Sequence, residues 1–450
     1  MITFDEILPK IKQLLEKYSD FINGIDWLVV NRDLNGRVRL VVPDDLRNDG
    51  EKIASLSLLS DEMSDSLSPH FHDSHATVIF ERDKQFVTDG AHLLKFDDFS
   101  NVWLADRFSN ESNWAEISDE TTNAPRVVFF SIKGGVGRST SLAATSWSLA
   151  QKGLRVLVLD LDLESPGLSS ALLPLERQPQ FGITDWLVED LVNNGDSVID
   201  SMIATSPLSH DGEIYIIPAH GIKPGEYISK LGRVWMPKIN GSGIKENWSK
   251  RLNRLINELE NKLSPDVILI DSRSGIDEVA SSCVTDIGAN LILLFALDGL
   301  QTWNGYRILF DHWLISDVSH KIRERLQIVA AMVPDIDGIE YLRSLREHSY
   351  DLLSETIYDQ IDPPPVDSIG PSGGINMTWR VDEIVEGWNF DSSDESAPHN
   401  PWAIQWHRSF AGSLTLHGRL AGIDNVSVQA IFGQLISGIE STLALEKTNE

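Results

Sequence analysis

A glycine-rich stretch follows an apolar run in the first third of the chain. The apolar run covers residues 127–130, and the stretch reads Ser131-Ile132-Lys133-Gly134-Gly135-Val136-Gly137-Arg138-Ser139-Thr140. A run compatible with a helix follows at residues 141–151. A strand, a glycine loop and a helix in this order place backbone N–H groups and a helix N-terminus around a phosphate chain. The sequence therefore predicts a phosphate-binding loop whose glycines let the backbone approach the anion without a Cβ in the way.

The spacing differs from that of the ordinary P-loop, which has a glycine five residues before its last glycine and a lysine just after it. Those two positions hold Ile132 and Arg138. Ser139 keeps the position at which a P-loop places its Mg²⁺-binding hydroxyl. A chance glycine-rich loop is the alternative interpretation, and the flanking strand, the helix and the basic residues argue against it.

The loop resembles the deviant Walker A loop of the ParA/MinD family, which has the form K-G-G-x-G-K-S/T-T. Lys133 matches the signature lysine of that family, and Arg138 replaces its P-loop lysine. A branch with a K-G-G-V-G-R loop is the most similar. The resemblance covers residues 126–340 and implies an α/β fold, namely a doubly wound, mostly parallel sheet of the P-loop NTPase type.

The same resemblance implies ATP and Mg²⁺ as ligands. The residues that would hold the nucleotide are Gly134, Gly135, Val136, Gly137, Arg138, Ser139 and Thr140. The guanidinium of Arg138 is wider than an ammonium and planar, so it is not a conservative replacement for lysine at a phosphate. Slow hydrolysis is therefore expected.

Two further apolar runs end in aspartates. Residues 155–159 lead into Asp160 and Asp162, and residues 267–270 lead into Asp271. Strands buried on both faces of a parallel sheet deliver such acids to its C-terminal edge, and alternation places Asp160 and Asp162 on the same side. Acids that only cap a strand end are the structural alternative.

The resemblance also implies roles for these residues. Asp162 would orient the attacking water, and Lys133 would reach the nucleotide of a second subunit across a sandwich dimer. Asp271 stands where the Walker B acid belongs. The predicted catalytic residues are thus Lys133, Asp162 and Asp271, and the predicted magnesium ligands, direct or through water, are Ser139, Asp160 and Asp271.

The segment after Asp271 departs from the family pattern D-x-P-P-G. It keeps Gly275, which would be a pivot whose N–H senses the γ-phosphate, but it exchanges the prolines for Arg273 and Ser274. Arg273 could contact a phosphate or pair with an acid of a partner subunit. A surface ion pair is the alternative.

Composition limits the kinds of partner. The chain has 450 residues and a net charge of −29, and DNA binding draws its free energy from neutralising phosphates with Lys and Arg. DNA should therefore be repelled overall. The locally basic residues 223–262 are a candidate contact for DNA or another partner, with a solvated helix face as the alternative.

A cytoplasmic location is expected. No apolar run reaches the roughly 18 residues that span a bilayer, the N-terminus does not read as a signal peptide, and Cys283 is the only cysteine. The helix expected at residues 426–445 lacks the basic face that anionic lipid requires. It is expected to pack on the core rather than to bind a membrane.

Three regions are predicted. Residues 1–122 read as an α+β module of unknown family for partner contact, residues 123–390 as the ATPase core, and residues 391–450 as a helical extension packed on the core. The polar residues 111–125 read as a linker.

His70, His72 and His75 could bind a metal, with a solvated loop as the alternative. Irregular residues 363–374 could close over the base.

The expected function is a nucleotide-switched ATPase that forms a dimer when ATP is bound and signals to an unidentified partner protein. Analogy with chains that have a similar loop suggests that it acts within a bacterial defence or stress module. One alternative is a ParA-like ATPase that positions DNA. Another is a nucleotide-binding scaffold with little hydrolysis. A bacterial tyrosine kinase on this loop would need a tyrosine-rich tail, and no tyrosine follows Tyr358.

Overall fold

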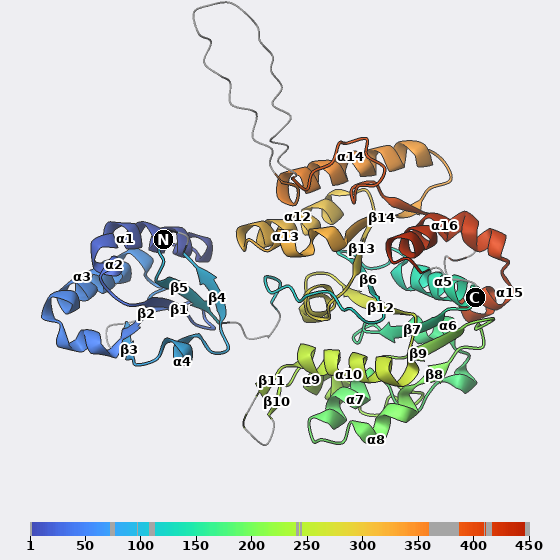
Figure 1. Ribbon diagram of the computed structural model, residues 1–450, viewed down its shortest axis with the longest axis horizontal. Helices are drawn as coiled ribbons and strands as arrows, with labels where there is room; N and C mark the ends of the chain where they lie inside the picture. The colour runs from blue at the N-terminus through green and yellow to red at the C-terminus, as the bar shows by residue number, and fades with distance from the viewer. Residues whose placement is uncertain are drawn as a thin grey trace, which may run out of the picture. The chain divides into compact units, whose positions relative to one another are not determined.

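The computed structural model describes residues 2–72, 77–96, 98–107, 113–239, 243, 245–359, 387–408, 410 and 416–445. The chain divides into two compact units, Met1–Glu111 and Ser112–Glu450 (Figure 1). Each unit has its own hydrophobic core. The three-region division expected from the sequence stays a prediction.

The N-terminal unit is an α+β module. Its five-stranded sheet has the order β3-β2-β1-β5-β4, and helices cover one face of it with apolar residues at helical spacing, such as Ile7 and Ile11. β1 and β2 pair antiparallel as a hairpin. The elements are α1 (Phe4–Lys17), α2 (Ser19–Asn23), β1 (Leu28–Arg32), β2 (Val38–Pro43), α3 (Gly50–Leu67), β3 (Val78–Glu81), α4 (Lys84–Thr88), β4 (His92–Lys95) and β5 (Val102–Asp106).

The histidine tract of this unit makes contacts with its own neighbours. His72 Nε2 lies 2.8 Å from Asp33 Oδ2 and 2.7 Å from Arg39 Nη2. His75 lies outside the described residues. His72 therefore has polar partners that do not require a metal ion.

The C-terminal unit is built on an eight-stranded sheet with the order β15-β14-β13-β6-β12-β7-β9-β8. Every neighbouring pair is parallel except β8 and β9. The predicted α/β, mostly parallel sheet is thereby confirmed. The strands are β6 (Arg126–Ser131), β7 (Arg155–Asp160), β8 (Ala204–Thr205), β9 (Glu213–Ile217), β12 (Val267–Ser274), β13 (Leu291–Ala296), β14 (Leu326–Val333) and β15 (Trp402–Gln405).

Helices cover both faces of this sheet, as in a doubly wound fold (Figure 1). Alternate residues of β6 face opposite ways, so Val127 and Phe129 pack with one helix layer and Val128 and Phe130 with the other. The first layer consists of α5 (Arg138–Gln151), α6 (Leu168–Leu172) and α16 (Asn425–Thr442), and the second includes α7 (Ile183–Asp190), α10 (Trp248–Leu263), α12 (Leu300–Ile315) and α14 (Gly338–Thr356).

Shorter elements complete the unit. They are α8 (Asp196–Ile199), α9 (Tyr227–Val234), α11 (Glu278–Ser281), a π-helical turn (Ser282–Asp286), α13 (Ser319–Ile322), α15 (Leu416–Gly422) and a ribbon of β10 (Lys238–Ile239) with β11 (Lys245–Glu246). In the described ranges, none of the helices combines the length and the apolar composition that crossing a bilayer requires.

The C-terminal region differs in part from the expectation of helices alone. α16 buries its apolar residues, such as Val428 and Leu435, as expected. However, β15 adds a parallel strand to the sheet beside β14. The sequence did not predict this strand because a four-residue strand shows too little alternation to be recognised. The loop at residues 363–374 lies outside the described residues.

The described part of the predicted linker lies on the C-terminal unit. Ser118 N–H donates to the carbonyl of Thr285 at 2.8 Å, Thr121 N–H donates to that of Gly288 at 2.9 Å, and Trp313 Nε1 donates to the carbonyl of Trp114 at 2.8 Å. Polar composition alone did not distinguish an extended docked segment from a free linker.

A buried carboxylate joins α7 to α10. Asp190 accepts hydrogen bonds from Lys238 at 2.8 Å, from Arg251 at 2.9 Å and from Arg254 at 2.8 Å. Burial alone would raise the pKa of Asp190, but the three cations outweigh it and hold the pKa below its usual value. This cluster shows why residues 223–262 carry so many basic side chains: several of them neutralise one buried acid.

Replacing this acid tests the cluster. Asp190→Ala would leave the fully buried Arg251 without its carboxylate, and it should lower the free energy of unfolding by about 3–5 kcal/mol. Urea unfolding measures the change. The control is Asp200→Ala, which removes an exposed ion pair with Lys262 and should cost less than about 1 kcal/mol. Equal effects of the two substitutions would contradict this account.

Candidate functional site

The predicted phosphate-binding loop lies between β6 and α5, as its sequence requires. Gly135 has φ +74° and Gly137 has φ +85°, a left-handed backbone that side chains disfavour. Gly137 is the N-cap of α5, so the first turn of the helix points at the loop. Such a helix start favours an anion through its unpaired N–H groups.

Three strands bring the predicted residues to one edge of the sheet. β12 lies between β6, which leads into the loop, and β7 (Figure 1). Asp271 of β12 is the register partner of Asp160 on β7 and of Phe129 on β6. Because these strands are parallel, the two aspartates and the loop meet at their carboxyl ends.

A direct contact joins the loop helix to β12. Ser139 Oγ donates a hydrogen bond of 2.5 Å to Asp271 Oδ2. Asp271 is only 1% exposed, and its other oxygen, Oδ1, has no hydrogen-bond partner among the described residues. Burial raises the pKa of Asp271 to about 6, against the opposing effects of Arg138 and Ser139.

Arg138 points toward the ends of the two acid-bearing strands. Its Nη1 donates to the carbonyl oxygen of Ser272, and its Nη2 lies 3.6 Å from Asp162 Oδ2. The side chain is buried. Burial raises the pKa of Asp162, and the charge of Arg138 opposes that rise. Arg138 thus provides the positive charge that faces these acids.

Asp160, the last residue of β7, is fully buried. Its Oδ2 accepts hydrogen bonds from the N–H groups of Gly167 at 3.3 Å and Leu168 at 3.2 Å, while Oδ1 has no partner among the described residues. Burial, followed by the nearby charges of Asp271 and Asp162, raises the pKa of Asp160 to about 8. Asp160 therefore fixes the turn that follows β7.

The donor set fits a magnesium ion bound together with a phosphate. The unpartnered oxygens of Asp160 and Asp271 are buried acceptors, and Mg²⁺ takes oxygen ligands. No three His, Cys, Asp or Glu side chains of the described ranges form a group that could hold a metal ion. Mg²⁺ commonly binds through one or two carboxylates and completes its shell with phosphate and water oxygens.

Two of the predicted site residues, Lys133 and Gly275, make no contact with the acids among the contacts described. Lys133 is exposed on the loop, and among the contacts described none joins its ammonium group to the acids. Gly275 has φ +98°, as a pivot requires, but its N–H donates to the carbonyl of Ser131 at 2.9 Å. That N–H must leave Ser131 before it can contact a phosphate.

Arg273 forms ion pairs within its own chain. Its Nη2 lies 2.6 Å from Glu164 Oε2, and its Nε lies 3.2 Å from Asp277 Oδ2. The sequence analysis identified Arg273 but neither acid. Long-range pairing of side chains leaves no signal in a single sequence, although the i, i+4 spacing of Arg273 and Asp277 was visible.

A small cavity of about 60 Å³ borders the loop at Gly137 and Thr140. The sequence analysis missed the residues that form its other wall. They are Met332, Ile404, Gln405, Trp406, His407, Phe410, Ile431 and Phe432. Met332 has φ +54°, which is uncommon for a residue other than glycine and costs free energy.

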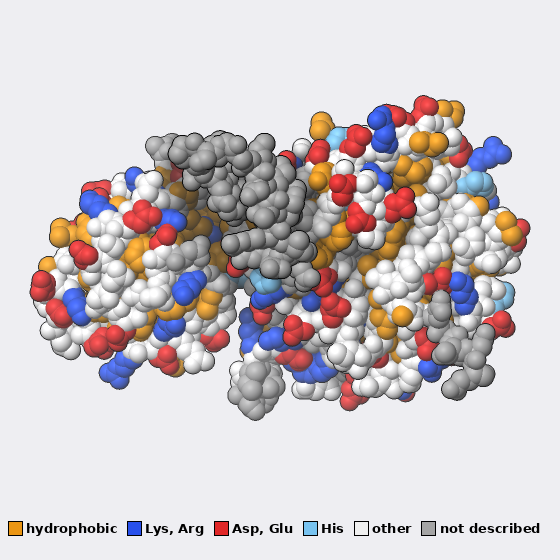
Figure 2. All heavy atoms as spheres, turned by 45° about the horizontal axis from the view of Figure 1, so that its top comes forward, with side chains coloured by type: hydrophobic (Ala, Val, Ile, Leu, Met, Phe, Trp, Pro, Cys, Tyr) orange, Lys and Arg blue, Asp and Glu red, His pale blue; other side chains and the backbone are white. Residues whose placement is uncertain are grey.

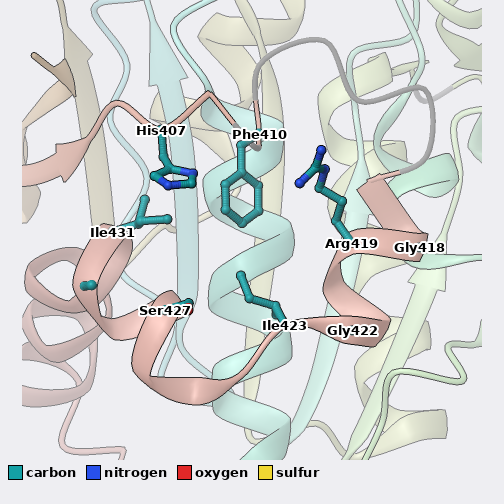
Figure 3. Close-up of a pocket in the computed structure, with 9 residues that line it drawn as sticks. His407, Phe410, Gly418, Arg419, Gly422, Ile423, Ser427 and Ile431 are labelled. Atoms are coloured by element: carbon teal, nitrogen blue, oxygen red, sulfur yellow. The ribbon is translucent and has the colours of Figure 1, made fainter. Parts of the chain in front are cut away.

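This cavity shares His407, Phe410 and Ile431 with a larger one of about 480 Å³. In Figure 3, Phe410 lies between His407 of the segment after β15 and Arg419 of α15, and Ser427 and Ile423 lie on the other side of the larger cavity. The two cavities are therefore neighbours, and the three shared side chains line both of them.

A family model described as the CobQ/CobB/MinD/ParA nucleotide binding domain matches residues 127–354, just over half of the chain. The chain belongs to this family. The matched range contains the glycine loop and all three aspartates of the site. The resemblance expected from the loop sequence is thereby confirmed, including the P-loop NTPase type of the core.

Individual relatives match over shorter ranges. The septum site-determining protein MinD of Buchnera aphidicola subsp. Acyrthosiphon pisum is 27% identical over 180 residues, which are 40% of this chain and 52% of that protein. MinD of Escherichia coli K12 is 31% identical over 108 residues, 24% of this chain and 36% of that protein. The chain thus spans about half of the first of these relatives and less of the second.

Solved structures with similar folds include MinD of Pyrococcus horikoshii complexed with Mg-ADP, with 22% identity, a TM-score of 0.32, and coverage of 47% of this chain and 70% of that one. Another is cobyrinic acid a,c-diamide synthase of Mycobacterium smegmatis with a bound ATP analogue and magnesium. Its identity is 18%, its TM-score is 0.34, and the match covers 53% of this chain and 86% of that one.

The pKa of Asp160 predicts a pH-dependent stability. Its folded-state pKa of about 8 exceeds the unfolded value of about 3.9. This carboxyl group therefore contributes stability below about pH 4 that is lost as the pH rises through about 8. Asp160→Asn keeps an acceptor for the two N–H groups and carries no charge.

This variant should be more stable than the natural protein at about pH 8.5, by about 1 kcal/mol or more, and its advantage should shrink at about pH 5. Urea unfolding in EDTA at both pH values measures the difference. Asp200→Asn, at an exposed position, is the control and should show little change between them. An Asp160→Asn advantage that does not depend on pH would contradict the assignment.

Proposed function

We propose that this chain is a nucleotide-switched ATPase. It binds ATP with Mg²⁺, forms a homodimer in the ATP-bound state and signals that state to an unidentified partner protein. The observation that carries the proposal is the contact of Ser139 with Asp271 beside the glycine loop, with Arg138 reaching Asp162. Phosphoryl transfer depends mainly on positioning and on charge stabilisation, which is what these residues offer.

The residues at the carboxyl end of the sheet, beside the glycine loop, would each bind a different part of the ATP–Mg²⁺ complex. The loop N–H groups and the α5 N-terminus bind the β- and γ-phosphates, and Arg138 adds fixed positive charge. Ser139, Asp271 and Asp160 would hold Mg²⁺, directly or through water. When bound, this ion neutralises charge that develops on the phosphate oxygens.

Hydrolysis would depend on Asp162 and Lys133. Asp162 lies in the turn just after β7, where its partly buried carboxylate can orient a water molecule for in-line attack. Lys133 is exposed on the loop, so it is available to a nucleotide bound by a second subunit. Arg138 must redirect part of its guanidinium from Ser272 and Asp162 to the phosphates, which supports slow turnover.

We assign the base of the nucleotide to the side of the loop on which the cavity beside Gly137 and Thr140 lies, where the side chains that line this 60 Å³ space would have to move apart to admit it. Trp406 and Phe410 offer aromatic surfaces on which a base can stack, and Met332 adds a polarizable apolar contact. The resemblance to the ParA/MinD family implies an asparagine that reads adenine at the end of this strand, whereas β14 ends at Val333 and is followed by Pro334 and Asp335. We therefore propose that stacking on aromatic side chains, rather than a hydrogen bond from an asparagine, holds the base.

Exposed apolar side chains support the homodimer. Leu300 is 81% exposed, Ile336 79% and Ile339 89%. These residues follow the carboxyl ends of β13 and β14, and therefore lie at the same edge of the parallel sheet as the glycine loop. Exposed apolar groups at such an edge are typical of an interaction surface.

Positioning of DNA is less well supported. Within the basic residues 223–262, Lys230 pairs with Asp185 at 2.5 Å, and the pairs on Asp190 neutralise three further cations. Red and blue side chains alternate over the visible face (Figure 2). A role in a bacterial defence or stress module is proposed only by association with chains that have a similar loop. Neighbouring genes that encode only segregation factors would contradict this role.

Phosphate release tests the enzyme assignment. Lys133→Ala and Asp162→Ala should each lower ATP turnover by about 100-fold or more, because Lys133 would contact the reacting phosphate and Asp162 would orient the attacking water. The affinity for a non-hydrolysable ATP analogue should change little in Asp162→Ala. Asp200→Ala, at an exposed position, is the control and should turn over ATP like the natural chain.

Two results would contradict the proposal in different ways. A natural chain that binds ATP but releases no phosphate would be a nucleotide-binding scaffold. A natural chain with no affinity for any nucleoside triphosphate in the presence of Mg²⁺ would exclude both interpretations. Dimer formation is measured in the same samples by light scattering with and without the analogue, and a monomer in both conditions would exclude the dimer.

A separate substitution tests the base site. Trp406→Ala should weaken ATP and ADP binding by about 5- to 150-fold, because stacking on an aromatic side chain contributes about 1–3 kcal/mol per base. Binding of inorganic triphosphate should not change, since it has no base. Phe86→Ala, on an exposed side chain of the N-terminal unit, is the control. Equal losses for ATP and triphosphate would show that Trp406 acts on the loop instead.

A further inference from the structure

Arg273 connects two segments that leave neighbouring strands. It lies near the end of β12, two residues after Asp271. Its Nη2 lies 2.6 Å from Oε2 of Glu164, which follows Asp162 by two residues in the turn after β7. The guanidinium thus joins the segment that carries Asp271 to the segment that carries Asp162.

A second contact fixes the other side of the guanidinium. Arg273 Nε lies 3.2 Å from Asp277 Oδ2, and Asp277 Oδ1 accepts the N–H of Ala280 at 2.9 Å as the N-cap of α11. Asp277 is therefore held by the helix that it caps. The side chain of Arg273 is 31% exposed and that of Glu164 is 39% exposed, so solvent screens this pair in part, and its value lies in the geometry that it fixes.

We propose that Arg273 is a positioning residue for hydrolysis: by holding Glu164, it fixes the turn after β7 and so places Asp162 for its water molecule. This inference rests on the proposed ATPase function. Only an arginine suits the task, because its planar fork reaches two carboxylates at once, whereas lysine is a single point charge. The proline that the family pattern places at this position would supply no such link.

A direct contact with a phosphate is the competing role for Arg273. The two roles differ in what Glu164 does. If Arg273 acts through Glu164, removal of either side chain breaks the same link, and the double variant loses no more than the single ones. If Arg273 touches the phosphate, removal of Glu164 has little effect and the losses add.

The experiment uses the full chain and compares Arg273→Ala, Glu164→Ala and the double variant. We expect each of the three to lower kcat about 10-fold, because a small misplacement of a positioned group is costly in rate. KM and the affinity for a non-hydrolysable ATP analogue should change less than about 3-fold, since the phosphate-binding loop is intact. Arg273→Lys should recover only part of the lost rate.

A matched control is available in the same unit. Arg307 pairs with Glu355 at 2.7 Å and joins α12 to α14. Arg307→Ala should leave kcat unchanged, which separates positioning from a general loss of an ion pair. Thermal unfolding of every variant checks that the chains are folded, and Glu164→Gln offers a milder loss of the same charge should Glu164→Ala not fold.

Two outcomes would overturn the inference while leaving the proposed function intact. One is an Arg273→Ala variant that hydrolyses ATP at the rate of the natural chain. The other is a loss in the double variant that equals the product of the single losses, which would indicate direct contact with the phosphate. A natural chain that neither binds nor hydrolyses ATP would instead overturn the proposed function itself.

Discussion

The site depends on one electrostatic constraint: carboxylates are buried at the end of a parallel sheet and must be neutralised there. Asp160 and Asp271 are register partners on β7 and β12, and burial makes their charged forms costly. Ser139 donates to Asp271, and Arg138 lies near Asp162. A cation bound with a phosphate would meet the same need more completely, which is the physical reason to expect a nucleotide here.

The features with a local signature were predictable from the sequence. The glycine loop, the strands that carry Asp160 and Asp271, and the helix α5 each follow from patterns within about ten residues. The parallel order of the strands makes these ends converge, so the positions of the loop and the two acids in the sequence predict where the site lies. The family match over residues 127–354 agrees with that prediction.

What the sequence did not reveal depends on contacts between distant residues. Trp406 and Phe410 reach the loop only because β15 joins the sheet beside β14. Glu164 and Arg273 meet because β7 and β12 are neighbours. A single sequence carries no periodic signal for such pairs, and the four residues of β15 are too few to show one.

Titration of the full chain with a non-hydrolysable ATP analogue, with Mg²⁺ and with EDTA, tests the central claim most directly. If Ser139 and Asp271 form a site for a cation bound with a triphosphate, calorimetry will show binding that is tighter with Mg²⁺, and Asp271→Asn will remove most of that difference. Binding that is equal with Mg²⁺ and EDTA, or no binding at all, would contradict the account.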